Sequence, residues 1–495
     1  MLSVGLPPDP RGFRLQVRRI LQASAIMGLS SVVTVGLSAL RYKLLALELG
    51  PEGIGLLGLF VTTLALGVTL FGMGVGSSGI RQVAASQSDD DGFGAATRAA
   101  LLRGSWLLGL LAAVAGLLLF PVLRASLFTD APALFLVGLV VAIAASVVSA
   151  GQVGLLNGLG RLPEIAKANS IGAVIGTALT LGLLPAAPQW ALAAAFVATP
   201  LAVLALTTGY TYQLRAKRTF TWAELWSAFR PMLFFGLAFS VSLLMSNLVQ
   251  ILLRILVNRK LDLENVGYFQ AAWTIASVYL GFVITSMAAE YYPRISAIAH
   301  DALEVNRQVN AQVRLMLFIA TPIIFLLVFL SPVIVAAMYA PEFGRATELL
   351  RWQLLGDIVK VASWPVGFLL LAREAKRAFF LSELIWNVSF LLLALVLIGP
   401  LGLKGLGLAY GCAYMLYFAA VLLFSAHLTG FKIDRHVWGF IFSALALSLW
   451  ARSLSTGRGA DNLWGWKILI VGLSVAIGVI LLIQRKDTPF STKRL

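Results

Sequence analysis

The sequence predicts an all-α integral membrane protein with about 14 transmembrane helices, arranged as two six-helix lobes and two additional C-terminal helices. Composition is the first reason, because 59% of the 495 residues are hydrophobic and only 12% are charged, whereas soluble domains carry about a quarter charged residues. The apolar residues also occur in runs that approach the roughly 20 needed to cross a bilayer. Finally, the two halves of the chain resemble each other, which predicts the lobes.

The expected spans follow one another with short polar connections. Pro322, Pro332 and Pro341 are expected to break the long ninth and tenth spans, because proline lacks the N–H that an inner helical turn needs. Glycines crowd segment 72–79 at the end of the second span, where small residues permit close packing or a bend. The spans expected from the apolar runs are 21–47, 54–80, 99–120, 133–157, 164–184, 190–214, 231–257, 266–291, 308–339, 344–371, 377–398, 404–428, 437–454 and 464–484.

Charge near the first span predicts the topology. The first apolar run follows Arg11, Arg14, Arg18 and Arg19 and continues into a full-length span, which argues against a cleavable signal peptide. With both termini in the cytoplasm, alternating loops place most of the 38 Lys and Arg inside, as the positive-inside rule expects. The net charge of +16 is then explained by topology and by attraction to anionic membrane lipids, so nucleic acid is not an expected partner.

The halves of the chain repeat at an offset of about 212 residues. Segment 41–55 resembles segment 254–267, and each leads into a new span. The register also pairs Arg103 with Arg314, Pro121 with Pro332 and Gly160 with Ala372. Because each half holds an even number of spans, both halves have the same orientation and form a parallel repeat.

The repeat predicts the domain organisation. The expected parts are an N-lobe (1–214), a cytoplasmic linker (215–230), a C-lobe (231–428) and an appended pair of helices with a cytoplasmic tail (429–495). Two such lobes favour a secondary transporter with its substrate path between them. Duplicated helical bundles that transport nothing are the alternative.

One face of the tenth span carries Gln353, Asp357, Lys360 and Trp364 at spacings of i, i+4, i+7 and i+11, which share one side of a helix. Ionisable groups within a span usually face a partner or an aqueous cavity. Asp357 and Lys360 could therefore simply neutralise each other. Alternatively, Lys360 attracts an anionic headgroup while Asp357 holds Lys360 or takes up a proton.

Two arginines occupy matching places in the repeat. Arg41 ends a polar stripe in the first span, and Arg254 ends a stripe in the seventh span that includes Gln250. Both guanidinium groups could bind phosphate as planar forks, or they could extend to the outer headgroup region. Glu290, near the inner end of the eighth span, is a second candidate for proton or ion coupling, although a carboxylate is also tolerated at such a helix end.

Several classes of function are disfavoured. Cys412 is the only cysteine, so disulfides and CxxC metal sites are excluded. No GxxxxGK[ST] phosphate loop occurs in the sequence, so the chain does not itself hydrolyse ATP. External loops are short and carry no nucleophile constellation, so we expect no enzyme, no catalytic residue, no metal and no cofactor.

Segment 352–360, WQLLGDIVK, closely resembles the corresponding segment of Wzx-type flippases. This is the polysaccharide-transporter branch of the multidrug/oligosaccharidyl-lipid/polysaccharide (MOP) exporter superfamily, and the O-antigen and enterobacterial common antigen translocases are the most similar members. The similarity continues to Glu383, covers segments 43–55 and 254–267 as well, and extends from about residue 20 to about residue 428.

The resemblance implies the MOP exporter fold and a location in the bacterial inner membrane. It implies an undecaprenyl-pyrophosphate-linked oligosaccharide as substrate and a central cationic cavity between the lobes. From the polar stripes we expect Arg41, Arg254 and Lys360 to bind the pyrophosphate, and from the two lobes we expect transfer to the periplasmic leaflet by alternating access. A polysaccharide polymerase and a chain-length regulator are candidate partners. The alternatives are a small-molecule or drug antiporter of the same superfamily and a non-transporting assembly protein. The last two spans and Glu290 depart from the family pattern.

Overall fold

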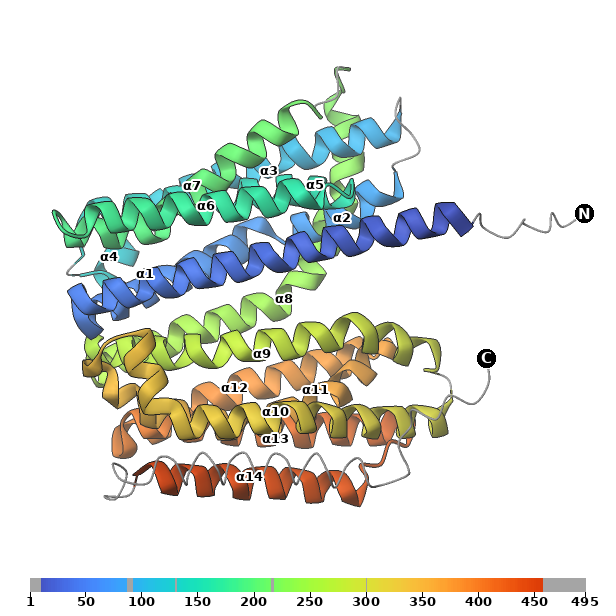
Figure 1. Ribbon diagram of the computed structural model, residues 1–495. Coiled ribbons are helices and arrows are strands. Elements are labelled where there is room, and N and C mark those ends of the chain that lie inside the picture. Colours follow the sequence, from blue (N-terminus) through green and yellow to red (C-terminus); the bar gives the residue numbers. More distant parts are fainter. Residues whose placement is uncertain (1–9, 87–91, 130, 215–217, 300, 457–495) are drawn as a thin grey trace, which may run out of the picture. The chain divides into compact units, whose positions relative to one another are not determined.

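The computed structural model describes residues 10–86, 92–129, 131–214, 218–299 and 301–456 (Figure 1). Every regular element within these residues is a helix, and ten of the described helices are long and apolar enough to cross a membrane. The expected span 464–484 lies outside the described residues. The chain divides into two compact parts, which we call unit 1 (Met1–Ile251) and unit 2 (Leu252–Leu495).

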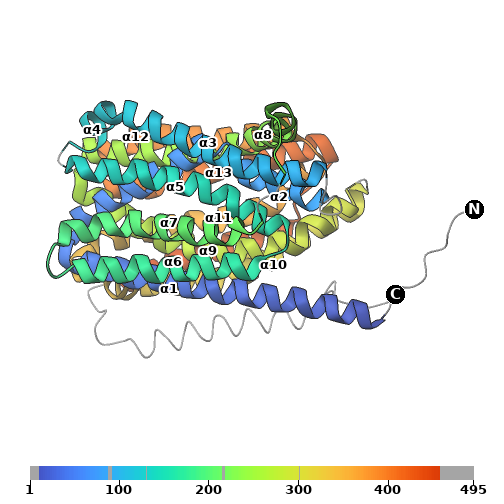
Figure 2. The same ribbon diagram turned by 90° about the horizontal axis from the view of Figure 1, so that it is seen from above.

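Unit 1 contains long helices that run side by side and roughly parallel or antiparallel (Figures 1 and 2). Its core includes Phe60, whose ring stacks on those of Phe128 and Phe196 at centroid distances of 4.4 Å each. The helices are α1 (Pro10–Gly72), α2 (Val75–Ala85), α3 (Phe93–Leu118), α4 (Phe120–Leu127), α5 (Ala133–Gly158), α6 (Leu162–Leu183), α7 (Pro188–Tyr212) and most of α8 (Trp222–Lys260).

The first two expected spans meet inside α1 at a sharp bend. Gly50 has φ 62°, a conformation that glycine adopts at little cost. Pro51 follows it, and proline is favoured at the first position of a helix because the N–H there has no helical partner. The Gly50–Pro51 pair thus ends one membrane helix and starts the next.

Helix α8 starts earlier than the expected seventh span, so residues 222–230 of the expected linker are helical. The start is a capping box: the Thr221 N–H donates to Glu224 Oε2 at 2.7 Å, and the Glu224 N–H donates to Thr221 Oγ1 at 3.3 Å. The hydrogen bonds from the backbone and hydroxyl of Thr221 lower the pKa of Glu224. Two local contacts therefore fix where this helix begins.

Helix α8 then packs closely against the break between α1 and α2. A Cβ on Gly236 would lie 2.3 Å from the carbonyl oxygen of Met73, and one on Gly74 would lie 2.4 Å from that of Gly236. The Ser78 hydroxyl donates to the Met232 carbonyl at 2.6 Å. Gly74, one of the glycines that crowd segment 72–79, therefore allows the backbone of α8 to approach closely.

Unit 2 is built around α11, most of whose residues are buried and which packs against α9, α10 and α13. Pro322 and Pro332 lie inside α10 and do not end it, so that expectation was wrong; neighbouring helices tolerate proline in membrane helices. Pro341 begins η1. The elements are α9 (Leu263–Ala297), α10 (Ala302–Met338), η1 (Pro341–Phe343), α11 (Gly344–Ala372), α12 (Lys376–Leu401), α13 (Leu403–Thr429) and α14 (Arg435–Thr456).

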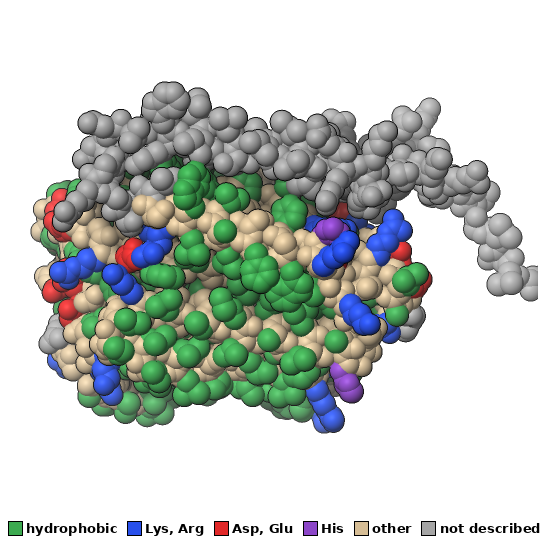
Figure 3. Space-filling model, turned by 90° about the horizontal axis from the view of Figure 1, so that it is seen from below, with side chains coloured by type: hydrophobic (Ala, Val, Ile, Leu, Met, Phe, Trp, Pro, Cys, Tyr) green, Lys and Arg blue, Asp and Glu red, His purple; other side chains and the backbone are tan. Residues whose placement is uncertain are grey.

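The protein surface matches a lipid environment. The face shown in Figure 3 carries a broad band of hydrophobic side chains, and charged side chains gather toward its two ends. Large apolar side chains such as Leu392, Val396 and Leu423 are exposed. An exposed apolar band of this extent is unusual on a soluble monomer, and it agrees with the prediction of a multi-pass membrane protein.

Candidate functional site

A buried carboxylate lies at the centre of unit 2. Asp357 of α11 is 0% exposed, and each of its oxygens accepts a hydrogen bond from a tyrosine hydroxyl. Tyr279 of α9 donates to Oδ2 at 2.7 Å, and Tyr410 of α13 donates to Oδ1 at 2.6 Å. The close approach of α13 depends on Gly356, where a Cβ would lie 2.8 Å from the ring of Tyr410.

Lys360 lies one turn further along α11 and is joined to Asp357 through Tyr410. Its Nζ donates to the Tyr410 hydroxyl at 3.3 Å and lies 5.2 Å from the centroid of the Tyr414 ring, within the range of a cation–π contact. The structure shows no direct ion pair between Asp357 and Lys360. A bridging hydroxyl thus joins the two side chains, and the ammonium lies against aromatic faces.

A second acidic side chain lies on α12. Glu383 Oε1 accepts a hydrogen bond from the Tyr417 hydroxyl at 3.2 Å. Tyr410, Tyr414 and Tyr417 form a continuous row along α13, with successive ring centroids 4.9 Å and 6.1 Å apart. We call the set the tyrosine-lined cluster; it consists of Asp357, Lys360, Glu383, Tyr279, Tyr410, Tyr414 and Tyr417.

Arg254 is buried in unit 2, where it is 2% exposed. Its Nε and Nη2 donate to Gln270 Oε1 of α9 at 3.2 and 2.7 Å, and its guanidinium lies 5.0 Å from the centroid of the Phe269 ring. Gln270 in turn donates to Thr274 Oγ1 at 3.1 Å. Arg254 is thus held against α9 inside the helix bundle, and its role in binding phosphate stays a prediction.

Arg41, its partner in the predicted repeat, has a different environment in unit 1. Its Nη1 donates to Thr199 Oγ1 of α7 at 3.2 Å, and the side chain is half-buried. Because Arg41 belongs to unit 1 while Arg254 and Lys360 belong to unit 2, a phosphate site shared by the three remains a prediction.

The two glutamines predicted to line the site are both buried. Gln250 lies one turn before Arg254 on α8. Gln353 is 1% exposed, and neither its amide nitrogen nor its amide oxygen has a hydrogen-bond partner among the described residues. Buried polar atoms are nearly always partnered in native proteins, so Gln353 is a site where a water molecule or a ligand group is expected.

Glu290 lies apart from the cluster. Its side chain is 81% exposed and pairs with Arg294, one turn later on α9, at 3.5 Å. Arg294 also donates to Gln312 of α10 at 3.1 Å. Of the two candidates for ion coupling, Asp357 is therefore the buried one and Glu290 the exposed one. In the described part of the chain, no three His, Cys, Asp or Glu side chains gather as a metal site would require.

Comparison with known proteins defines the class and then the family. Two solved structures share the fold. One is the lipid II flippase MurJ in an inward closed conformation, with a TM-score of 0.69 and 16% identity; the match covers 92% of this chain and 98% of that one. The other is an inward-facing multidrug resistance MATE transporter, with a TM-score of 0.67 and 16% identity; the match covers 83% of this chain and 98% of that one. The chain is thus a multi-pass membrane protein with the fold of MOP superfamily transporters. It belongs to the polysaccharide biosynthesis protein family, whose model matches residues 20–299.

Sequence relatives agree with this placement. The lipid III flippases of Escherichia coli strain K12 and of Shigella flexneri are each 25% identical over 169 residues, which is 34% of this chain and 40% of each relative. The match therefore spans less than half the length of these relatives. The proteins found are flippases and transporters, not enzymes, in agreement with the expectation that this chain is not an enzyme.

Proposed function

We propose that this protein is a flippase for lipid-linked oligosaccharides of the bacterial cytoplasmic membrane. Its substrate is an undecaprenyl-pyrophosphate-linked repeat unit of O-antigen or a related surface polysaccharide, carried to the periplasmic leaflet by alternating access. Membership of the polysaccharide biosynthesis protein family and similarity to named lipid III flippases support this proposal. Both termini are placed in the cytoplasm, and a polysaccharide polymerase and a chain-length regulator are the proposed partners.

The observation that carries the proposal is the state of Lys360. Its ammonium is held inside a membrane helix by the hydroxyl of Tyr410 and by aromatic rings, without a direct ion pair. A charge in such a place is costly and is usually retained for function. Among the described residues no carboxylate contacts it directly, and in this proposal its positive charge attracts the anionic headgroup.

Arg254 adds a second cationic group suited to phosphate. Its guanidinium donates through two nitrogens to one neutral amide oxygen of Gln270. A planar guanidinium forms stronger, charge-assisted hydrogen bonds to phosphate than to an amide. In the proposed mechanism the pyrophosphate displaces Gln270 and engages Arg254, Lys360 and Arg41, while Gln250, Gln353 and Asp357 contact the glycan or orient the cations.

The aromatic row of α13 gives the proposed site a surface for sugars. Tyr410, Tyr414 and Tyr417 each offer an apolar ring and a polar hydroxyl. Trp386 of α12 extends the row, because its ring centroid lies 5.2 Å from that of Tyr414. Rings of this kind pack against the apolar faces of a glycan, and the hydroxyl oxygens of Tyr410 and Tyr417, which donate to Asp357 and Glu383, are acceptors for its hydroxyl groups.

The proposed driving force is the membrane potential. A headgroup with two negative charges that leaves an interior-negative cell gains about 2.3 kcal/mol per charge per 100 mV. Coupling to a proton or ion through Asp357 or Glu290 is the second proposed source, and Asp357 is the better placed because it is wholly buried, whereas the Glu290 side chain is 81% exposed.

Export of small cations is the second candidate function. It is favoured by the fold shared with a multidrug resistance transporter. The Lys360 ammonium opposes it, since a positive charge beside the site repels a cationic drug.

Reconstitution tests the proposal. We expect proteoliposomes with the wild-type protein to move a polyprenyl-pyrophosphate oligosaccharide, and Arg254→Ala, Lys360→Ala and Asp357→Asn to lose transport at matched protein levels. Arg161→Ala, which removes an ion pair to Glu164 at 2.8 Å in unit 1, serves as the matched control and keeps transport. If the wild type moves small cations but not the lipid, the second candidate function replaces the first.

A further inference from the structure

Helix α14 follows the predicted repeat and has no counterpart in it. It packs against α10 and α11, and it contains 22 residues from Arg435 to Thr456. Apolar contacts alone are enough to hold an appended helix in place. Both ends of α14 nevertheless carry polar attachments to the helices that support the tyrosine-lined cluster.

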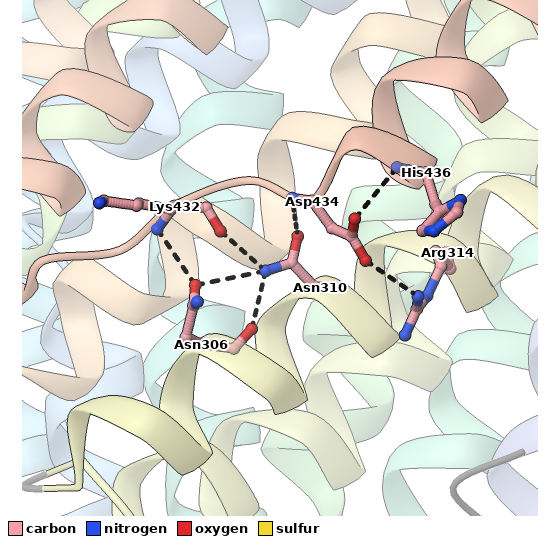
Figure 4. A network of polar contacts seen from close by, with 6 residues as sticks. All are labelled: Asn306, Asn310, Arg314, Lys432, Asp434 and His436. Atoms are coloured by element: carbon pink, nitrogen blue, oxygen red, sulfur yellow. Dashed lines mark hydrogen bonds and ion pairs between the residues drawn. The ribbon is translucent and has the colours of Figure 1, made fainter. Parts of the chain in front are cut away.

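The first attachment joins the segment before α14 to α10 (Figure 4). Asn310 accepts from the Asp434 N–H at 2.8 Å and donates to the Lys432 carbonyl at 3.0 Å, and Asn306 accepts from the Lys432 N–H at 3.1 Å. Arg314 forms an ion pair with Asp434 at 3.3 Å. Two asparagines and one arginine on successive turns of α10 thus hold the chain where α14 begins.

The second attachment joins the other end of α14 to α11. Arg452 forms an ion pair with Glu348 at 2.5 Å, and its guanidinium lies 4.6 Å from the centroid of the Trp352 ring. Trp352 also donates to Glu348 at 3.1 Å. Ion pairs with good geometry and additional hydrogen bonds are the kind that persist in apolar surroundings.

The second attachment also includes a contact with helix α10. Arg351 of α11 is 5% exposed; it pairs with Glu348 at 3.6 Å, and its Nε donates to Ser331 Oγ of α10 at 2.9 Å. Polar contacts thus join α10, α11 and α14 near the C-terminal end of α14. Near the N-terminal end of α14, they join α10 to the segment that precedes α14. Moving α14 away from α11 would remove the Arg452 partner of Glu348 and leave this half-buried carboxylate with Arg351 and Trp352, which is costly.

The second attachment lies on the helix that carries the site. Glu348 and Asp357 are nine residues apart on α11, or about 13.5 Å along the helix axis. Because a helix is stiff over this length, fixing α11 at Glu348 also fixes its rotation at Asp357. A rotation of about 100°, the step between neighbouring residues, would remove Asp357 from the hydroxyls of Tyr279 and Tyr410.

We propose that α14 is a brace that keeps α10, α11 and α14 together as one body during transport, and that Arg452 and Asp434 are positioning residues for Asp357 and Lys360. The functional meaning of the brace rests on the proposed function, since it assumes that the tyrosine-lined cluster handles the substrate. The geometric part does not depend on the substrate and can be tested without transport.

The test is the rate at which dicyclohexylcarbodiimide, an apolar reagent for protonated carboxyl groups, modifies Asp357 in purified protein across a pH series. Mass spectrometry of the Asp357 peptide gives the rate, and Asp357→Asn identifies the product. We expect Arg452→Gln and Asp434→Asn to raise the rate about 3- to 10-fold and to shift its pH profile, because a displaced Asp357 loses tyrosine partners that favour its charged form.

Controls separate positioning from misfolding. Arg161→Gln removes an ion pair in unit 1 and should leave the profile unchanged. Arg452→Lys keeps the positive charge beside Glu348 and should restore part of the wild-type profile. A wild-type profile in both brace variants, or an Arg452→Lys profile no closer to that of the wild type than the Arg452→Gln profile, would overturn the brace. Failure of wild-type transport would instead count against the proposed function.

Discussion

Unit 1 and unit 2 differ in the polar groups that they bury. In unit 1, Gln152 of α5 accepts from the Thr207 hydroxyl at 2.6 Å and contacts that of Thr208 at 3.0 Å, so amides and hydroxyls hold the helices together. In unit 2, Asp357 is wholly buried, and Arg254 and Arg351 are nearly so. Neutral hydrogen bonds between membrane helices contribute about 0.6 kcal/mol on average, whereas buried charges are costly.

This difference indicates that the buried polar groups of the two units have different roles, which a symmetric repeat would not predict. Arg41 and Arg254 occupy matching places in the sequence, but Arg254 is 2% exposed and donates to Gln270 through two nitrogens, whereas Arg41 is half-buried and donates to Thr199. We infer that recognition of the charged headgroup depends mainly on unit 2, and that the buried polar groups of unit 1 serve mainly to pack helices.

The largest expected effect is on transport. Lys360→Met should lower it about 10- to 100-fold, which corresponds to the ~1.5–3 kcal/mol of a hydrogen bond to a charged group. Arg254→Gln should lower the transport rate to a similar extent, and Arg41→Gln should lower it by less than about 10-fold. The measurement is the initial rate of lipid-linked oligosaccharide transport at matched reconstitution. Equal losses for Arg41→Gln and Arg254→Gln would remove the distinction between the two units.

The next effect concerns packing in unit 1. Gly236→Ala places a Cβ about where the Met73 carbonyl oxygen approaches, and overpacking of this kind costs about 1–3 kcal/mol. Thermal unfolding in detergent should show the loss. Gly209→Ala in α7 is the matched control, because open space surrounds that glycine; it should stabilise slightly. A Gly236→Ala variant that is as stable as the wild type would contradict the close approach of α8 to α2.

A smaller effect is expected from the neutral network of unit 1. Gln152→Leu removes the partner of Thr207 and Thr208, but Thr207 also donates to the Val203 carbonyl at 2.8 Å and so keeps one hydrogen bond. We expect a loss of about 0.5–1.5 kcal/mol in stability and unchanged transport per folded molecule. Loss of transport without loss of stability would place Gln152 in the transport site.

The smallest effect is the pH dependence of the α8 start. The pKa of Glu224 is lowered by its hydrogen bonds with Thr221, so its contribution is present above its unfolded pKa of about 4.3 and is lost as pH falls through the lower folded value. The protection of the first-turn amides of α8 against hydrogen exchange, taken relative to the intrinsic exchange rate at each pH, should fall in that acidic window. Glu224→Gln should make this protection insensitive to pH there; a persistent pH dependence would assign it to another group.

The sequence predicted the helices well because long apolar runs with polar connections are strong signals. The start of α8 was assigned to a linker because its capping box, Thr221 to Glu224, lies in a charged stretch. In α10 the prolines did not break the helix, since neighbouring helices support it. The first miss is a local signal that was not recognised, and the second is a local signal that packing overrides.

The site was predicted only in part. Asp357 and Lys360 were expected to share a face of one helix, and they do. Tyr410, Tyr414 and Tyr417 were missed although their i, i+4, i+7 spacing was a usable signal, because aromatic residues in an apolar span are usually packing residues. Pairs such as Glu348 with Arg452, 104 residues apart, carry no signal in a single sequence.

The most direct test of the charged site compares two lipids that carry the same oligosaccharide, one through a pyrophosphate and one through a neutral ether. Transport of each is measured in proteoliposomes with wild-type protein and with Lys360→Met. We predict that the wild type moves the pyrophosphate form at least about 10-fold faster, and that Lys360→Met abolishes most of this preference. Equal transport of both lipids by the wild type would contradict the account, because the buried cations would then have no part in recognising the headgroup.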